Sequence, residues 1–349
     1  MKTYKNLYEK ICAFDNLVFA AKKAHRGKRH RPNIAAFDFR LEKELLGLRA
    51  ELISQTYHPG RYRAFNILEP KKRLISAADY RDRVVHHALC NLIEPIFNRS
   101  FIFDSYANRQ GKGTHSAIQR FQEYAQKYRF VLKCDIKKYF PSIDHEILKG
   151  LIRKKVACRK TLWLIDSIID NSNKQELVTD YFPGDDLFTP LVRRKGLPLG
   201  NLTSQFFANI YLDGLDHFCK EQLKIKGYLR YVDDFVIFAD RKTDLWIILI
   251  EIKNYLESLR LVLNRNKTMS YPVTGGVEFL GHKVFPEFRR LKRDNVIRFR
   301  KHLKYWREQY QKGIFILDDL TRRIKGWIAH ASFSKTYHLR QAVLEKFRI

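Results

Sequence analysis

The chain has 349 residues, and 45% of them are apolar, so it can bury one large core with satellite lobes and is not a disordered chain. Lys and Arg number 66 against 37 Asp and Glu, and the resulting charge of +29 favours a polyanionic partner, with nucleic acid first and a membrane surface second. The membrane surface fits less well, because the basic residues are spread along the whole chain instead of lying in one amphipathic helix.

The first part of the chain begins with helical patterns and continues with extended ones. Residues 1–58 carry apolar side chains at helical spacing, interrupted by a basic loop over 25–33. Two alternating segments then predict a hairpin around Pro70, and a helix is expected over 82–97. A buried strand is expected over 129–136.

The second part mixes the two kinds of element. Its predicted elements are a helix opened by Asp144, a long helix over 201–223, a hairpin over 227–240, a helix over 244–261 and short strands over 277–285. From residue 290 onward the pattern is helical and basic. Because strands and helices do not alternate as in a doubly wound sheet, we predict an α+β fold, with a helix-covered sheet between two helical lobes.

The cysteines and the longest apolar run bear on cellular location. The five cysteines show no C-x-x-C spacing, so buried free thiols are expected rather than a zinc site. An odd number of cysteines without a signal peptide fits a reducing cytosol. The run "LWIILI" at 245–250 is too short to span a bilayer, so no membrane segment is expected.

Two acidic points interrupt the apolar strands. In "GYLRYVDDFVIFAD", Asp233 and Asp234 lie side by side at the expected hairpin tip, where two negative charges repel unless a cation balances them. In "VLKCDIKKYFPSID", Asp135 lies where a strand ends. If the two strands are neighbours, Asp135 and Asp233 meet at one end of the sheet. Such a site suits Mg²⁺, and two ions roughly 3.5 to 4 Å apart promote an in-line phosphoryl displacement.

Each acidic point also has a plain structural explanation. An Asp that follows a strand often serves as a turn or helix-cap residue. Asp233 and Asp234 are also compatible with a simple type I′ turn. A basic chain with one small acidic focus nevertheless matches what a nucleotidyl transferase requires.

"YVDD" inside an apolar hairpin resembles the catalytic signature of reverse transcriptases, and further blocks follow the order expected for that family. They are "KKRLISAADYRDRVVHHAL", "SYANRQGKGTHSAI", "VLKCDIKKYFPSI", "GLPLGNLTSQFFANIYL", "LRLVLNRNKT" and "VEFLGHKV". The resemblance covers about residues 60–290. It implies an RNA-directed DNA polymerase with a right-hand fold of fingers, palm and thumb.

The resemblance implies how the chain divides. The expected parts are an N-terminal helical extension over 1–58, fingers over 59–130, a palm of antiparallel sheet and helices over 131–289, and a helical thumb over 290–349. Part of the fingers is expected as an insertion around 150–195. Trp327 is expected in the core of the thumb, with template stacking as the alternative.

The same resemblance implies roles for residues of the palm. Asp135, Asp233 and Asp234 match the catalytic carboxylates, with Asp234 in a supporting role. Together with Ile136 they match the positions that hold two Mg²⁺ ions, for which Mn²⁺ can substitute. Phe140 matches an aromatic gate that excludes a 2′-hydroxyl, because a rigid ring beneath the incoming sugar leaves no room for an oxygen. The alternative is an ordinary core Phe.

Basic residues are expected around the incoming nucleotide. Arg73, with Lys71 or Lys72, matches fingers residues that hold the triphosphate, and the bidentate fork of Arg suits phosphate. Lys267 matches a palm lysine near the departing pyrophosphate, or else it is a solvated surface lysine.

A glycine-flanked lysine is expected at the template. Gly111 and Gly113 flank Lys112 in "RQGKGTHS". Glycine lets backbone amides approach a phosphate closely. In its position after the fingers block, this segment is expected to contact the template.

The second palm block departs from the usual pattern. Most reverse transcriptases read Gln-Gly, three residues and then Ser-Pro, whereas this chain reads "LGNLTSQ", with Leu199 and Gly200 at the nucleotide site and Gln205 in place of Pro. The variant resembles the enzymes of diversity-generating retroelements, which copy a template-repeat RNA into cDNA with errors at adenines for mutagenic retrohoming. Leu199 cannot make the hydrogen bond of a Gln, so Leu199 and Gln205 are expected to relax selectivity. A substitution neutral for fidelity is the alternative.

The resemblance also implies partners. They are template RNA and the RNA–cDNA duplex, dNTPs, and a small basic helical accessory protein, in a bacterial or phage-encoded enzyme of the cytoplasm. Two other hypotheses stand beside this one. The first is a group II intron or retron-like reverse transcriptase of ordinary fidelity. The second is a non-catalytic nucleic-acid-binding protein with a polymerase fold, against which the intact carboxylates argue.

Overall fold

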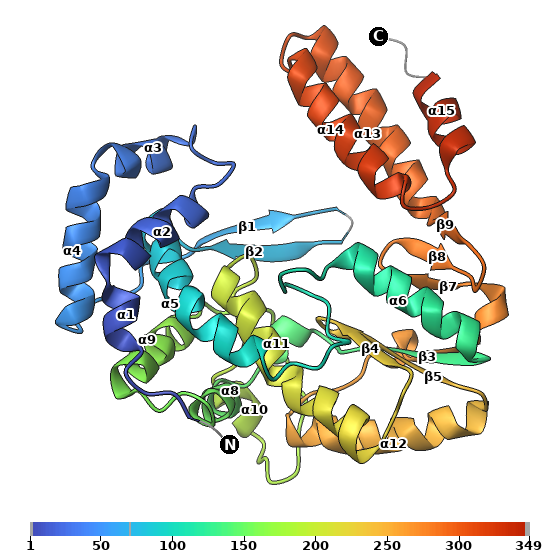
Figure 1. Cartoon of the computed structure of the whole chain (residues 1–349), viewed down its shortest axis with the longest axis horizontal. Coiled ribbons are helices and arrows are strands. Elements are labelled where there is room, and N and C mark those ends of the chain that lie inside the picture. The colour runs from blue at the N-terminus through green and yellow to red at the C-terminus, as the bar shows by residue number, and fades with distance from the viewer. Residues whose placement is uncertain (1–2, 70, 346–349) are drawn as a thin grey trace.

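The computed structural model describes residues 3–69 and 71–345, and it combines helices with antiparallel sheets as predicted (Figure 1). The first region is helical. Its elements are α1 (Tyr8–Cys12), α2 (Phe14–Ala24), α3 (Pro32–Phe39) and α4 (Leu41–Ile53). The longer helix α5 (Tyr80–Asn98) packs along α2, whose buried side chains include Leu17, Ala20 and Ala24. This region therefore shares its core with the elements that follow.

The predicted basic loop over 25–33 ends earlier than expected. Arg31 is extended, and Pro32 begins α3, because the fixed φ of Pro suits the first helical position and its missing N–H is not needed there. Most of α3 lies in the region expected to be helical, whereas α9 (Arg159–Asp170) was not predicted as a helix.

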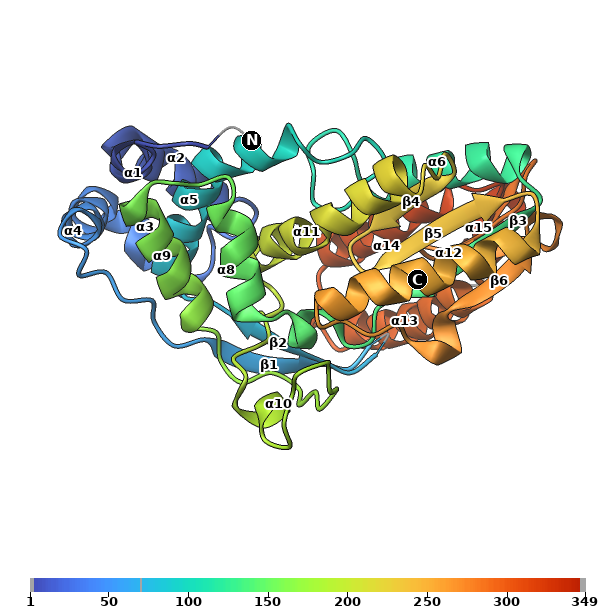
Figure 2. The same cartoon turned by 90° about the horizontal axis from the view of Figure 1, so that it is seen from below.

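The hairpin expected next is present. β1 (Arg63–Ile67) pairs antiparallel with β2 (Arg73–Ala77). Pro70, around which it was expected to turn, lies outside the described residues. The hairpin extends away from the N-terminal helices toward α13 (Arg293–Gln311) (Figure 1 and Figure 2). Near its end, Glu69 Oε2 lies 3.0 Å from Nε2 of His302 in α13, so two regions distant in sequence are in contact there.

The centre of the molecule is a four-stranded antiparallel sheet with the strand order β4-β5-β3-β6. Its strands are β3 (Phe130–Asp135), β4 (Tyr228–Tyr231), β5 (Asp234–Ala239) and β6 (Met269–Pro272). Both faces of β3 and β5 are covered, and both strands are mainly apolar, with Lys133 as the exception inside β3. Leu132 and Ile237 pack into the large core with α12 (Lys242–Ser258), whereas Val131 and Phe238 pack with α6 (Thr114–Lys127).

Further helices come from the segments between and beside these strands. They are α7 (Tyr139–Ser142), α8 (His145–Arg153), α9, α10 (Thr189–Val192) and α11 (Leu202–His217), which continues into the π-helical turn η1 (Phe218–Gln222). Asp144 opens α8 as predicted, because its Oδ1 accepts the backbone N–H groups of Glu146 and Ile147. Its other oxygen accepts a hydrogen bond from Arg260 at 2.6 Å, which links α8 to the end of α12.

The C-terminal region has a second sheet and a separate helical core. Its elements are the 3₁₀ turns η2 (Arg265–Lys267) and η3 (Val273–Gly275), the strands β7 (Val277–Phe279), β8 (His282–Val284) and β9 (Arg289–Leu291), and the helices α13, α14 (Leu317–Ala331) and α15 (Tyr337–Glu345). The rings of Phe299 and Trp327 stack 3.8 Å apart inside the helical core, so Trp327 is a core residue as expected. Residues 346–349 lie outside the described part, and the boundaries of the expected domains stay a prediction.

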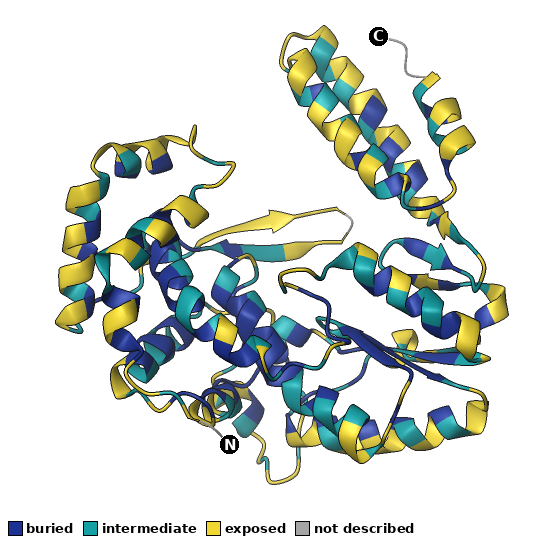
Figure 3. Cartoon of the chain, viewed as in Figure 1, coloured by how far each residue is buried: buried dark blue, intermediate teal, exposed yellow. Residues whose placement is uncertain are grey.

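Burial follows this arrangement. Buried positions gather on α5, α11 and the central strands, whereas β1 and the outer faces of α13 and α14 are largely exposed (Figure 3). One large core runs from the N-terminal helices to the central sheet. Among the described residues, no helix has both the length and the apolar composition that a bilayer crossing requires.

The central position of β5 predicts the effect of a core deletion. Ile237 is fully buried, so Ile237→Ala should lower the free energy of unfolding by about 2–5 kcal/mol through lost contacts and a residual cavity. Ile250, on α12, is 58% exposed, and Ile250→Ala should change the free energy of unfolding by less than about 0.5 kcal/mol. Urea denaturation of both variants measures the difference, and equal losses would contradict the described core.

Candidate active site

The pairing of β3 with β5 brings the predicted acidic residues together. In this antiparallel register Asp135 lies directly opposite Asp234, and Tyr231 of β4 lies on the other side of Asp234. Asp233 is the residue before β5, in the turn that joins β4 to β5. Asp135 is 7% exposed, so the acidic group lies at a largely buried sheet end. The expected meeting of Asp135 with the Asp233–Asp234 pair is thus present, and their catalytic role stays a prediction.

The turn that carries Asp233 is strained at the preceding residue. Val232 has φ of 57°, a conformation that β-branched residues rarely adopt. A type I′ turn requires positive φ at both central residues, and Asp233 does not have it. The alternative of a simple type I′ turn is therefore wrong.

The proximity of the carboxylates changes their protonation. Burial first, and then the charges of Asp234 and Asp135, raise the pKa of Asp233 to about 6, although Lys267 acts in the opposite direction. Burial and the charge of Asp135 also raise the pKa of Asp234, against the effect of Lys133 and Lys267. A cation bound between these groups would relieve both the repulsion and the burial of unpaired charge.

Lys267 is part of the acidic site. Its Nζ donates hydrogen bonds to both carboxylate oxygens of Asp135, at 2.9 and 2.8 Å, from the 3₁₀ turn η2. Its side chain is 50% exposed, so Lys267 is a surface lysine that also pairs with Asp135. Its expected place near a departing pyrophosphate stays a prediction.

The donor set fits Mg²⁺ in kind. Asp135, Asp233 and Asp234 supply carboxylate oxygens, which hard divalent cations prefer. Within residues 3–69 and 71–345, no group of three His, Cys, Asp or Glu side chains is arranged to hold a metal ion unaided. Mg²⁺ usually takes one or two protein carboxylates and completes its shell with water and substrate phosphates, so two carboxylates suffice. Ile136 is buried beside Asp135 and forms a β-bridge with Leu263.

Phe140 lies on the short helix that follows β3. Its ring is half-buried, packs against the large core and meets Tyr139 edge-to-face with ring centroids 5.7 Å apart. Its carbonyl accepts the backbone N–H of Leu197 at 2.9 Å, which joins this helix to the segment before Leu199. Both expectations for Phe140, a sugar gate and an ordinary core Phe, are compatible with a half-buried ring.

The segment at Leu199 is attached to the β1–β2 hairpin. The Leu199 carbonyl accepts the N–H of Ser76 in β2 at 2.9 Å. Gly200 has φ of +115°, and a Cβ there would lie 2.9 Å from Cγ2 of Ile75, so only glycine fits. Gln205 is half-buried on α11.

Asn201 is a residue of this segment that the sequence did not single out. It is buried, its Oδ1 accepts from the N–H of Ala78 at 3.0 Å, and its Nδ2 donates to the carbonyl of Ser76 at 2.8 Å. The sequence offered one signal for this role of Asn201, which is its position between a Gly and the start of a predicted helix. Asn201 therefore ties the Leu199 segment to β2 through its side chain.

The expected triphosphate-binding residues lie at the end of the fingers hairpin. Lys71, Lys72 and Arg73 are all exposed, and Arg73 begins β2 opposite Ile67. The structure does not place them in contact with the carboxylates, so their role stays a prediction.

The glycine-flanked lysine lies in the loop before α6. Gly111 and Gly113 have φ of +73° and +126°. Lys112 Nζ donates to the carbonyl of Phe103 at 3.0 Å and lies 3.3 Å from the centroid of that ring, so its ammonium is engaged within the protein. Burial lowers the pKa of Lys112. The expected contact of Lys112 with the template stays a prediction. The flanking glycines are less constrained by contacts within the protein than Lys112 is.

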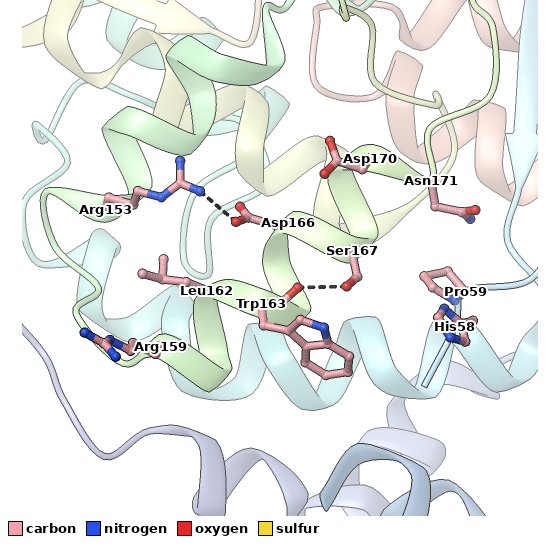
Figure 4. Close-up of a pocket in the computed structure, with 10 residues that line it drawn as sticks. All are labelled: His58, Pro59, Arg153, Arg159, Leu162, Trp163, Asp166, Ser167, Asp170 and Asn171. Carbon is pink, nitrogen blue, oxygen red and sulfur yellow. Dashed lines mark hydrogen bonds and ion pairs between the residues drawn. The ribbon is translucent and has the colours of Figure 1, made fainter. Parts of the chain in front are cut away.

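A cavity of about 790 Å³ lies elsewhere, along α9 (Figure 4). Trp163 faces His58 and Pro59 across it, and Arg153 donates to Asp166 on its wall at 2.6 Å. None of the predicted site residues lines it. The candidate active site at the end of the β3–β5 pair is therefore separate from this cavity.

The antiparallel sheet with its acidic end, the hairpin before it and the helices after it define a right-hand polymerase fold. Residues 67–284 match the family model of reverse transcriptase (RNA-dependent DNA polymerase). The chain belongs to the reverse transcriptase family, and it is an RNA-directed DNA polymerase by that membership.

Several known proteins are similar to the chain. Protein YkfC of Escherichia coli (strain K12) is 26% identical over 308 residues, covering 77% of this chain and 78% of YkfC. The Group II intron-encoded protein LtrA of Lactococcus lactis subsp. cremoris is 28% identical over 188 residues, which are 53% of this chain and 29% of LtrA. Among solved structures, an apo telomerase from Candida tropicalis truncated from its C-terminal domain has a TM-score of 0.49 and 15% identity, covering 70% of this chain and 59% of that one.

The raised pKa of Asp233 predicts a pH-dependent stability. Because its pKa is about 6 in the folded chain, the folded chain binds this proton more tightly than the unfolded chain does. The resulting stabilisation is complete below about pH 4 and is lost as the pH rises through about 6, so ionised Asp233 lowers stability at neutral pH.

Asp233→Asn should therefore raise the free energy of unfolding by on the order of 1–3 kcal/mol at about pH 7.5 in EDTA, and by less at about pH 4.5. Chemical denaturation at both pH values measures this. Asp240→Asn, at the exposed residue that follows β5, is the control for removing a carboxylate outside the acidic site. A gain for Asp233→Asn that does not change with pH would contradict the electrostatic origin.

Proposed function

We propose that this polymerase is the reverse transcriptase of a diversity-generating retroelement. It copies a template-repeat RNA into cDNA with errors at adenines, and the cDNA serves mutagenic retrohoming into a target gene. The register that sets Asp135 opposite Asp234 supports the polymerase chemistry. The "LGNLTSQ" segment, with Leu199 in place of Gln, supports the mutagenic subtype.

The acidic sheet end suits nucleotide transfer to a primer. In this proposal Asp135 and Asp233 hold two Mg²⁺ ions with the carbonyl of Ile136, Asp234 supports them, and Mn²⁺ can substitute. When bound, such ions activate the primer 3′-hydroxyl and stabilise the leaving oxygen. The 3′-hydroxyl gives its proton to solvent water and its oxygen bonds to the α-phosphorus of the dNTP. The bond from that phosphorus to the bridging oxygen breaks, and pyrophosphate leaves. Lys267, already on Asp135, places a positive charge where the leaving group needs one.

The fidelity proposal depends on how Leu199 is held. Its backbone is hydrogen-bonded to Ser76, and the next residue, Gly200, fits closely against Ile75. The Leu side chain has no donor or acceptor for a nascent base pair, so the difference in free energy between correct and wrong pairs should shrink. Gln205, one helical turn into α11, is proposed to contribute to the same effect.

The partners follow from the charge of the chain. Template RNA, the RNA–cDNA duplex and dNTPs are polyanions, and α13 presents Arg298, Arg300, Lys301 and Lys304 on a helix beyond the palm. A small basic helical accessory protein is proposed as a further partner on the resemblance alone.

A group II intron-like reverse transcriptase of ordinary fidelity is the second candidate, and the similarity to LtrA favours it. Adenine-rich RNA templates distinguish the two, because accurate copying of adenine supports the second. A non-catalytic nucleic-acid-binding protein is the third candidate. It would be supported if replacing Asp233 and Asp234 by Ala left the biological function unchanged.

Removal of the paired carboxylates should abolish catalysis. Asp233→Ala combined with Asp234→Ala should reduce primer extension on RNA with dNTPs by more than about 100-fold, beyond the loss typical of an outer-shell residue. Mg²⁺ should raise the thermal midpoint of the unchanged chain but not of this variant. Asp240→Ala is the control, and unaltered extension by the double variant would refute the catalytic assignment.

A change at Leu199 should alter the error spectrum. Leu199→Gln should lower misincorporation opposite template adenine by about tenfold, because the restored amide can again discriminate pairs by hydrogen bonding. Sequencing of cDNA copied from a mixed-base RNA measures errors at each template base. Leu191→Gln, at a position 59% exposed, is the control. If the adenine errors persist in Leu199→Gln, Leu199 is neutral for fidelity.

A further inference from the structure

Arg230 is a charged residue at the centre of the apolar hairpin. It lies in β4 two residues before the strained Val232, and its side chain is 0% exposed. Asp216 of α11, also 0% exposed, accepts two hydrogen bonds from it, from Nε at 2.7 Å and from Nη2 at 2.6 Å. The pair is bidentate, which is the geometry that only Arg provides.

Another nitrogen of Arg230, Nη1, reaches the turn that carries Asp233. Nη1 donates to the carbonyl of Val232 at 3.1 Å and to Oδ1 of Asn209 in α11 at 3.2 Å. The hydroxyl of Tyr228 donates a third hydrogen bond to the Asp216 carboxylate, at 2.7 Å. One guanidinium therefore connects α11 to the backbone immediately before Asp233.

The conformation of Val232 needs such a contact. Positive φ in a β-branched residue is unfavourable and persists only where the surroundings determine it. The carbonyl of Val232 is part of the peptide unit that leads into Asp233, so fixing that oxygen also fixes the direction in which the Asp233 backbone starts. Asp233 is in turn followed by Asp234, opposite Asp135.

Fold stability alone is a poor explanation for this arrangement. Taking two charges out of water costs free energy that their attraction only partly returns, and apolar residues of similar volume often serve stability as well or better. What an apolar pair cannot do is hold a backbone carbonyl in place.

We propose that Arg230 is a positioning residue that, supported by Asp216, fixes the Val232 carbonyl and thereby sets Asp233 in the orientation needed to bind the catalytic metal ions. This inference rests on the proposed metal-binding role of Asp233.

Arg230→Lys tests the proposal, because a lysine keeps the charge but cannot bond to both Asp216 oxygens and to Val232 at once. We expect the Mg²⁺ concentration for half-maximal primer extension to rise about 10- to 100-fold, as for loss of other outer-shell partners of metal ligands. kcat should fall at low Mg²⁺ with little change in KM for dNTP. The shift of the thermal midpoint on adding Mg²⁺ should need correspondingly more metal, which reports binding without activity.

Val232→Gly separates positioning from general stability. Glycine adopts positive φ without strain, so Arg230→Lys combined with Val232→Gly should need less Mg²⁺ than Arg230→Lys alone. Arg193→Lys is the matched control, since Arg193 is 7% exposed and pairs with the buried Asp185, away from the turn. It should leave the Mg²⁺ requirement unchanged.

Asp216→Asn provides a milder variant if Arg230→Lys does not fold, and it should raise the Mg²⁺ requirement in the same direction. An unchanged Mg²⁺ requirement in a folded Arg230→Lys or Asp216→Asn chain, or strictly additive effects of Arg230→Lys and Val232→Gly, would overturn the proposal. Failure of the unchanged chain to show any Mg²⁺-dependent extension or thermal shift would instead refute the metal role of Asp233.

Discussion

The antiparallel pairing of β3 with β5 is the constraint on which the site depends. Its register sets Asp135 opposite Asp234, and like charges facing each other across a sheet are destabilising. Alternate residues of both strands enter two separate cores, so a slip by one residue would exchange every core position between the two faces. Burial of apolar side chains such as Leu132 and Ile237 therefore keeps the carboxylates together, and the remaining repulsion favours a cation beside them.

The nearest cation in the structure is itself informative. Lys267 binds both oxygens of Asp135, although 132 residues separate them in sequence. Lysine is a compact charge on a flexible stem, and Lys267 is half exposed, so it can leave Asp135 without disturbing the core. Either Lys267 or a metal ion can neutralise Asp135. The flexible Lys267 side chain can then move toward a negative charge that develops nearby. In a chain with a charge of +29, Lys133 and Lys267 are the cations that act on Asp234.

The sequence predicted the parts that depend on local pattern. Apolar runs ending at Asp135 and at the Asp233–Asp234 pair indicated the central strands, and Asp144 indicated the start of α8, because burial and capping are properties of neighbouring residues. It did not predict α9 or the contacts of Arg230 and Asn201. Asn201 bonds to residues more than 120 positions away, and such pairings depend on how elements pack in space rather than on spacing along the chain.

The carboxylates and Leu199 are held in place by different sets of hydrogen bonds. Arg230 and Asp216 connect β4 to α11 inside the palm, whereas Leu199 and Asn201 are hydrogen-bonded to β2 of the exposed hairpin. A movement of that hairpin would shift the backbone at Leu199 while leaving the β3–β5 register unchanged. Under the proposed function, selectivity at the nucleotide and chemistry at the carboxylates would thus rest on different hydrogen bonds, so a sequence could relax the first while the second stays intact.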